Sequence, residues 1–163
     1  MIEPFRIEVP AETIASLHRR LENTRWPTGV TDSGGMPLSD MRDLVNYWLN
    51  QFDWSKQEQR INQWPHFRVR LGGQRVHFIH IRAGNPNATP LLLLHGWPGS
   101  FIEMMELIPL LTGSFHLVIP SLPGFGFSDA PSAPGMSNER IASIMADLMS
   151  ALQESMHKLK KAK

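Results

Sequence analysis

The sequence contains no cysteine and only one tyrosine. Without cysteine, the chain has no disulfide framework, no thiolate nucleophile and no cysteine-based metal site. Lys and Arg number 16 against 15 Asp and Glu, so no global field attracts nucleic acid or an anionic membrane. The chemistry of this chain must therefore be sought in local motifs.

Long hydrophobic runs are also missing. No segment approaches the roughly 18 consecutive apolar residues of a membrane helix, and residues 1–8 carry charges where a secretory signal needs an apolar core. The sequence thus favours a soluble, cytoplasmic protein with no membrane and no nucleic-acid partner. Its 163 residues suffice for one domain with a hydrophobic core, or for one domain and part of another.

Nucleophile and cofactor motifs are absent as well. No Gly-X-Asp-X-Gly or Gly-X-Ser-X-Gly elbow occurs in the chain. The pair Gly124 and Gly126 lacks the third glycine of a dinucleotide-binding loop and does not open a helix directly. We expect no cofactor and no metal, because four histidines in or beside predicted strands lack metal-ligand spacing: His66, His77, His80 and His116.

Helical periodicity dominates the first part of the chain. After a short extended segment, Pro10 suits the first turn of a helix whose apolar residues recur up to Leu21. Glycine-rich residues 28–35 favour turns.

Two more helices are predicted before residue 65. One begins near Leu38, with Ser39 as its cap, and its apolar face is expected to belong to the core. The other covers about 56–62, because Ser55 and Glu58 stand at capping-box spacing.

From residue 66 the pattern becomes that of an α/β fold. Two apolar stretches on either side of Gly72-Gly73 predict a β-hairpin. A leucine run at 91–94, helical periodicity up to Gly113 and a buried strand at 115–119 predict a parallel βαβ unit. Ser137 is expected to cap a final helix.

The leucine run ends abruptly at His95-Gly96-Trp97-Pro98. Four leucines in a row are typical of a strand buried on both faces. In an open parallel sheet, ligands bind outside the carboxyl ends of the strands, where this turn lies. One interpretation is a purely structural turn with His95 hydrogen-bonded in a packed interior. The other is a catalytic turn, and these four residues alone leave both open.

Several segments, taken together, resemble the epoxide hydrolases that carry an extra N-terminal region, the microsomal and juvenile-hormone type of the α/β-hydrolase superfamily. They follow the family's order along nearly the whole chain and are residues 21–27, 47–48 with 50–54, 67–70, 76–82, 95–100 and 120–128. The resemblance implies an N-terminal meander over residues 1–65. It also implies the first half of an α/β-hydrolase core over 66–163, truncated before the nucleophile elbow, hence a partial α/β-hydrolase fold.

The resemblance also implies a site and a reaction. The backbone N–H of Trp97 would be half of an oxyanion hole, and His95, Gly96 and Pro98 would line the substrate pocket. In the family, an aspartate on a Gly-X-Asp-X-Gly elbow attacks the epoxide, and a histidine-activated water hydrolyses the resulting ester. Since that elbow is absent here, as are the acid partner and the general base, the chain alone is expected to be inactive. It would act on a small-molecule epoxide only if completed by the missing half.

Two alternatives stay open. The missing nucleophile favours a non-catalytic binding or regulatory module. A fragment of another α/β-hydrolase, such as a dehalogenase or esterase, is disfavoured by residues 24–27, because those families usually lack this extension. In either case, an exposed sheet edge is expected where the elbow strand would pair, open to a second copy or a complementing chain.

Overall fold

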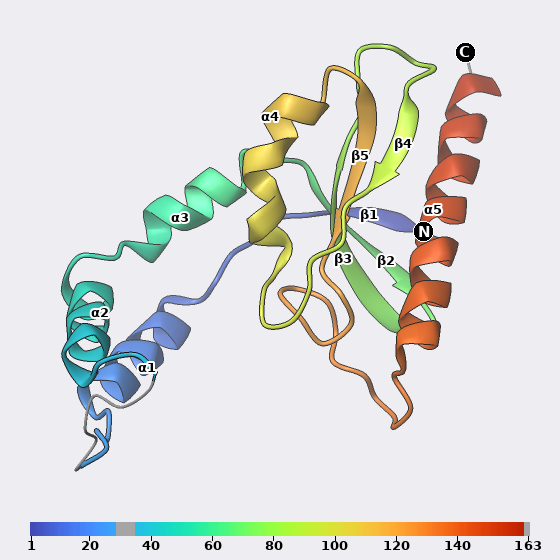
Figure 1. The fold of residues 1–163 in the computed structure, drawn as a ribbon. Helices are drawn as coiled ribbons and strands as arrows, with labels where there is room; N and C mark the ends of the chain where they lie inside the picture. The colour runs from blue at the N-terminus through green and yellow to red at the C-terminus, as the bar shows by residue number, and fades with distance from the viewer. Residues whose placement is uncertain (29–34, 162–163) are drawn as a thin grey trace. The chain divides into compact units, whose positions relative to one another are not determined.

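The computed structural model of the chain describes residues 1–28 and 35–161, with side chains described as far as residue 154. These residues form two compact units. The sheet unit comprises Met1–Arg6 and Asn62–Lys163, and the helical unit comprises Ile7–Ile61 (Figure 1). Most of the predicted turn segment, residues 29–34, lies outside the described residues.

The sheet unit is built on a mixed sheet. In the described residues its strands are β1 (Ile2–Phe5), β2 (His66–Leu71), β3 (Gln74–Ile81), β4 (Thr89–Leu92) and β5 (Phe115–Pro120), in the order β1-β2-β3-β5-β4. Neighbours are antiparallel except β4 and β5, which are parallel. The predicted hairpin and the predicted parallel pair are both confirmed.

The hairpin turn consists of Gly72 and Gly73. Their φ angles of 57° and 89° lie in the region that glycine adopts readily, as a two-residue turn between twisted strands requires. The turn brings Leu71 opposite Gln74 and thereby sets the register of the whole hairpin.

Helix α5 (Asn138–Lys161) covers one face of the sheet (Figure 1). Its apolar stripe is buried against strand residues from β2, β3 and β5: Ile144, Met145, Leu148 and Leu152 pack in one cluster with Val69, Val76, Phe78 and Val118. The predicted cap is present, because Ser137 Oγ accepts a hydrogen bond from the Arg140 N–H at 3.4 Å. Among the described helices, none combines the length and apolarity needed to cross a bilayer.

The opposite face carries η1 (Phe101–Leu107) and α4 (Ile108–Leu111), which contact β5 (Figure 1). Sequence periodicity predicted one helix here, whereas the structure has a 3₁₀ segment followed by a short α-helix. Pro109 explains the break, because it lacks the N–H that would continue the hydrogen-bond ladder from the preceding turn. The inward residues Phe101, Met105 and Ile108 are buried as expected.

The prediction that Leu91–Leu94 is buried on both faces is wrong. Strand β4 is at the edge of the sheet, with β5 as its neighbour. Leu91, Leu92 and Leu93 are only half-buried, and Leu94 is exposed, because one flank of an edge strand has no strand beside it.

The helical unit contains α1 (Ala11–Glu22), α2 (Leu38–Asn50) and α3 (Trp54–Ile61). The prediction that the second helix belongs to the core is wrong, since no residue of Leu38–Asn50 is buried. Three helices of 12, 13 and 8 residues offer too little surface to enclose large side chains.

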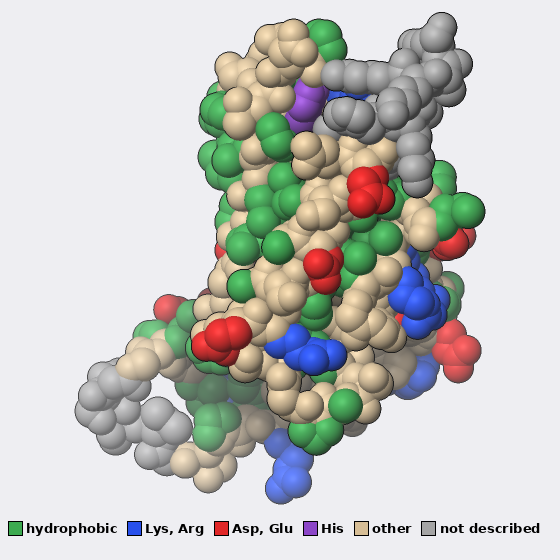
Figure 2. Space-filling model, turned by 90° about the vertical axis from the view of Figure 1, so that its right-hand side faces the viewer, with side chains coloured by type: hydrophobic (Ala, Val, Ile, Leu, Met, Phe, Trp, Pro, Cys, Tyr) green, Lys and Arg blue, Asp and Glu red, His purple; other side chains and the backbone are tan. Residues whose placement is uncertain are grey.

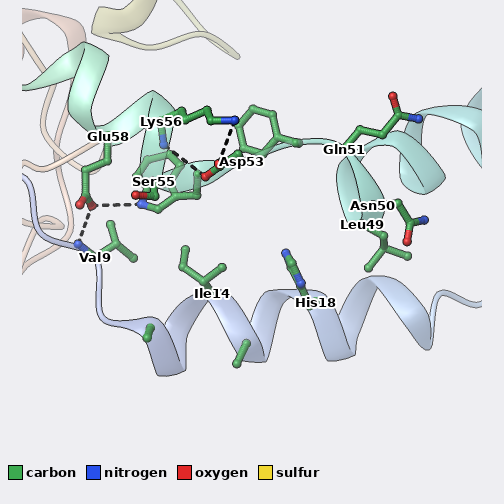
Figure 3. Close-up of a pocket in the computed structure, with 14 residues that line it drawn as sticks. Val9, Ile14, His18, Leu49, Asn50, Gln51, Asp53, Ser55, Lys56 and Glu58 are labelled. Carbon is green, nitrogen blue, oxygen red and sulfur yellow. Dashed lines mark hydrogen bonds and ion pairs between the residues drawn. The ribbon is translucent and has the colours of Figure 1, made fainter.

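Both predicted caps in this unit are also wrong. Ser39 Oγ donates to Asp40 Oδ1 at 3.2 Å and caps nothing, and Pro37 occupies the cap position of α2. At α3 the cap is Asp53, whose Oδ1 accepts from the Lys56 N–H at 3.2 Å. Glu58 instead accepts from the Trp54 indole at 3.0 Å and the Val9 N–H at 2.8 Å (Figure 3).

Truncating the α5 stripe should destabilise the sheet unit. Leu148 is fully buried, so Leu148→Ala should lower the free energy of unfolding by about 2–5 kcal/mol in urea titrations. Leu110 is 76% exposed, and the same truncation there should cost less than about 0.5 kcal/mol. Equal losses in the two variants would contradict the packing of α5 on the sheet.

Candidate functional site

Two loops leave the carboxyl ends of the adjacent parallel strands β4 and β5. We call residues 93–100 the β4 loop and residues 121–131 the β5 loop. Because the two strands are parallel and paired, both loops begin at the same edge of the sheet. This is the edge at which open α/β sheets bind ligands.

The β4 loop makes a sharp turn. The Leu93 N–H donates to Val118 O at 2.9 Å, and the Gly99 N–H then donates to Gly96 O at 2.8 Å, with a cis peptide between Trp97 and Pro98. The Trp97 side chain is 85% exposed. In the part of the chain that the structure describes, the Trp97 N–H has no hydrogen-bond partner. This amide is therefore available to an acceptor outside the chain.

His95 joins the two loops. Its buried ring accepts a hydrogen bond from the Leu122 N–H at Nε2, at 3.0 Å, and Nδ1 lies 3.3 Å from Gly96 O. Because the carbonyl can only accept, these contacts fit a neutral ring protonated at Nδ1. The ring also packs edge-on against Phe125, with centroids 5.2 Å apart. His95 is thus buried and hydrogen-bonded, as the structural interpretation of the turn predicts. A role in a substrate pocket stays a prediction for His95, Gly96 and Pro98.

The β5 loop is held to the hairpin by side chains. Arg68 Nη2 donates to Phe127 O at 2.9 Å, with its guanidinium 3.8 Å above the Phe5 ring centre. Asp129 accepts the Arg75 N–H at 3.0 Å and pairs with its guanidinium at 3.1 Å. The hydrogen bonds from Arg75 lower the pKa of the Asp129 carboxyl. The β5 loop is therefore held to the hairpin at Phe127 and Asp129.

A buried chain of hydrogen bonds lies beneath this loop. His66 Nδ1 is 2.9 Å from His77 Nε2, and His77 Nδ1 is 2.8 Å from Ser121 Oγ. Ser128 Oγ accepts the His77 N–H at 2.9 Å and donates to Ser121 O at 2.7 Å. Burial, the neighbouring His66 and the Arg68 charge lower the pKa of His77 to about 3. This network keeps a neutral imidazole under the loop.

Sequence reasoning missed this network. It treated His66 and His77 only as residues unsuited to bind metal. The contact between His66 and His77 could have been predicted from the two-residue turn. The turn pairs Leu71 with Gln74, and this register places the two histidines on one face of the hairpin as diagonal neighbours. The sequence spacing of these residues gives no indication that His77 contacts Ser121.

Among the described residues, no three His, Cys, Asp or Glu side chains lie close enough together to hold a metal ion. A cavity of about 770 Å³ lies in the helical unit, where His18 and Ile14 of α1 face Leu49 of α2 (Figure 3). A cavity of about 290 Å³ lies in the sheet unit. Neither is lined by the β4 loop.

Comparisons with known proteins point to one family. A family profile described as "Epoxide hydrolase N terminus" matches residues 2–104, and one described as "alpha/beta hydrolase fold" matches residues 89–155. A Stigmatella aurantiaca protein named "Putative epoxide hydrolase" is 46% identical over 93% of this chain. Epoxide hydrolase 1 of Sus scrofa is 38% identical over 91%. The chain spans only 37% and 36% of these relatives.

Solved structures agree with this. The juvenile hormone epoxide hydrolase of Bombyx mori is 35% identical, with a TM-score of 0.83 over 93% of this chain and 44% of that one. A mutant epoxide hydrolase of Aspergillus niger is 30% identical, with a TM-score of 0.85 over 92% of this chain and 42% of that one. The predicted partial α/β-hydrolase fold is confirmed.

The buried His77 predicts a loss of stability in acid. The unfolded chain binds a proton at this ring below about pH 6.5, whereas the folded chain does so only near pH 3, so the free energy of unfolding falls across that window. In His77→Gln, urea titrations at several pH values should show a slope shallower by up to about 1.4 kcal/mol per pH unit. Leu110→Ala removes an exposed side chain that does not titrate and should keep the parent slope. An unchanged slope in His77→Gln would contradict the neutral buried ring.

Proposed function

Because the chain belongs to the epoxide hydrolase family whose N-terminal region it matches, we propose that it is the N-terminal part of an enzyme that converts an epoxide to a vicinal diol. The observation that carries this proposal is the Trp97 N–H, which has no hydrogen-bond partner among the described residues and belongs to an exposed residue on the turn after β4. The family match also makes a fragment of an unrelated hydrolase the weaker alternative.

The proposed role of Trp97 is electrostatic. When an aspartyl ester is hydrolysed, the carbonyl oxygen becomes an oxyanion in the tetrahedral intermediate. A fixed N–H aimed at that oxygen lowers the barrier by about 2.7–4 kcal/mol. His95, Gly96 and Pro98 would set the direction of this amide and line the substrate pocket, and the hydrogen bond from Leu122 to His95 would keep the turn in place.

The nucleophile, the acid and the general base would come from sequence that these 163 residues do not contain. No Gly-X-Asp-X-Gly segment is present, and the relatives are more than twice as long. We therefore propose that the chain alone has no turnover. A small-molecule epoxide would be processed only after completion by the remaining part of the fold. A cytoplasmic location stays a prediction.

A chimera tests the role of the Trp97 amide. This chain, fused to the remaining part of the Bombyx mori juvenile hormone epoxide hydrolase, should form diol from styrene oxide, whereas the unfused chain should form none. Trp97→Pro deletes the N–H and should lower kcat by roughly 10²–10³. Trp97→Ala keeps the N–H and removes only an exposed side chain, so it should stay close to the parent.

Two results would count against the proposal. One is diol formation by the unfused chain that is lost in its Trp97→Pro variant. The other is a chimera in which Trp97→Pro and Trp97→Ala are equally active, with circular dichroism showing that both are folded.

A second candidate function is binding through the free edge of β4. Because the Leu93 N–H points to β5, the backbone groups of Leu92 and Leu94 point away from the sheet. Pro90 also faces outward and has no N–H to offer. A partner strand would therefore pair with the Leu92–Leu94 half of the edge. A second copy or a complementing chain could supply it.

Charge on this edge should reduce association. Leu94 is 46% exposed, and Leu94→Lys should shift the chain from dimers or larger species toward monomer in light scattering. Leu110→Lys, also exposed but outside the sheet, should leave the parent distribution unchanged. A parent chain that is already a cooperatively folding monomer would exclude this function.

A further inference from the structure

The cavity of about 290 Å³ is lined by no residue of the β4 loop or the β5 loop. It is bounded by the beginnings of β4 and β5, the end of β3 and helix α5, through Pro90, His116, His80 and Met149 among others. The loops of the proposed catalytic site leave the other ends of β4 and β5. A ligand in this cavity would not occupy the epoxide site.

Two histidines present complementary nitrogens to this cavity. His116 is 3% exposed, and its Nδ1 accepts the Ala83 N–H at 3.0 Å, so Nε2 of the neutral ring carries the proton. His80 Nδ1 lies 3.0 Å from Leu117 O and must donate, which leaves Nε2 as an acceptor. Among the described residues, neither Nε2 has a hydrogen-bond partner. Both rings line the cavity, so the His116 Nε2–H donor and the His80 Nε2 acceptor are available to a ligand there.

The electrostatics of the cavity favour an anion. Arg82 lines it and has no ion-pair partner in the described part of the chain. Burial lowers the pKa of His80, and His116 and Arg82 lower it further, against the opposing effect of the Leu117 carbonyl. Among the side chains that the structure describes, no carboxylate lines the cavity, and those from α5 are Met149, Leu152 and Gln153. Within this described lining, Arg82 therefore carries a positive charge with no carboxylate beside it.

The remaining lining is mostly apolar. Val118, Met149 and Leu152 offer hydrocarbon surface opposite the polar groups. The volume is just below the range typical of drug-sized ligands, so the occupant must be small. Figure 2 looks onto the side that carries α5, where a histidine side chain is visible at the surface.

We propose that this cavity binds a small aliphatic carboxylate. Its carboxylate would accept hydrogen bonds from Arg82 and from His116 Nε2–H, and its hydrocarbon body would lie against Met149 and Leu152. A metal ion is a poor alternative, because the described residues bring no three metal-ligating side chains together. The proposal does not depend on the proposed epoxide chemistry.

Calorimetric titration of the full chain tests the chemistry of the ligand. Hexanoate should bind with one-to-one stoichiometry and shift the ring resonances of His80 and His116 in NMR spectra. Hexan-1-ol lacks the charge and hexylammonium reverses it, so both should bind at least roughly tenfold more weakly. Titration with inorganic phosphate, an anion without a hydrocarbon chain, tests whether the site binds any anion or requires the aliphatic body as well. Phosphate binding as tight as hexanoate, or equal binding of hexan-1-ol, would overturn it.

Variants locate the site. Arg82 is exposed, so Arg82→Gln should fold normally and weaken hexanoate binding by roughly tenfold. Arg140→Gln removes the same charge from α5 outside the cavity and should bind as the parent does. Met149→Trp should fill the cavity and abolish binding. Unchanged affinity in folded Arg82→Gln and Met149→Trp would place any binding elsewhere and refute the proposal.

Discussion

The hydrogen bond from the Leu122 N–H to the buried His95 ring fixes the arrangement of both loops. Polar backbone groups in a partly buried loop need partners, and two loops without ladder pairing cannot supply all of them. Side chains are the partners here. The His95 ring accepts the Leu122 N–H, and Arg68 donates to the Phe127 carbonyl. Ser128 Oγ accepts the His77 N–H and donates to the Ser121 carbonyl. The turn that carries Trp97 is therefore held against the β5 loop, which is itself hydrogen-bonded to the hairpin.

Local patterns predicted the sheet unit well. The Gly72-Gly73 turn, the two apolar stretches of the hairpin and the α5 stripe each encode one element through spacing alone, and these form as predicted, whereas the leucine run forms an edge strand and is not buried on both faces. The His95–Pro98 turn was also found from its residues, because a strand that ends in glycine and proline has few conformations. The catalytic role proposed for this turn came from resemblance, since a backbone N–H has no side-chain signature.

The remaining features depend on tertiary context that periodicity does not contain. An apolar stripe predicts which residues of α2 share a face but not whether enough protein surrounds them. Likewise, Ser55 and Glu58 have capping-box spacing, yet Glu58 finds better donors in Trp54 and Val9. The hydrogen bond between Ser121 and His77 joins residues 44 positions apart, so no local sequence motif predicts it.

The position of β1 in the sheet has a consequence for the order of folding. Phe5 pairs with His66, so the intervening residues 6–65, which include all of the helical unit, form a single closed loop. Closing that loop costs about 3 kcal/mol more chain entropy than closing the two-residue hairpin turn between β2 and β3. The hairpin can therefore nucleate early, and β1 adds to an edge that already exists. Among the described strand pairings, that of β1 with β2 closes the longest loop, and non-local pairing of this kind forms slowly.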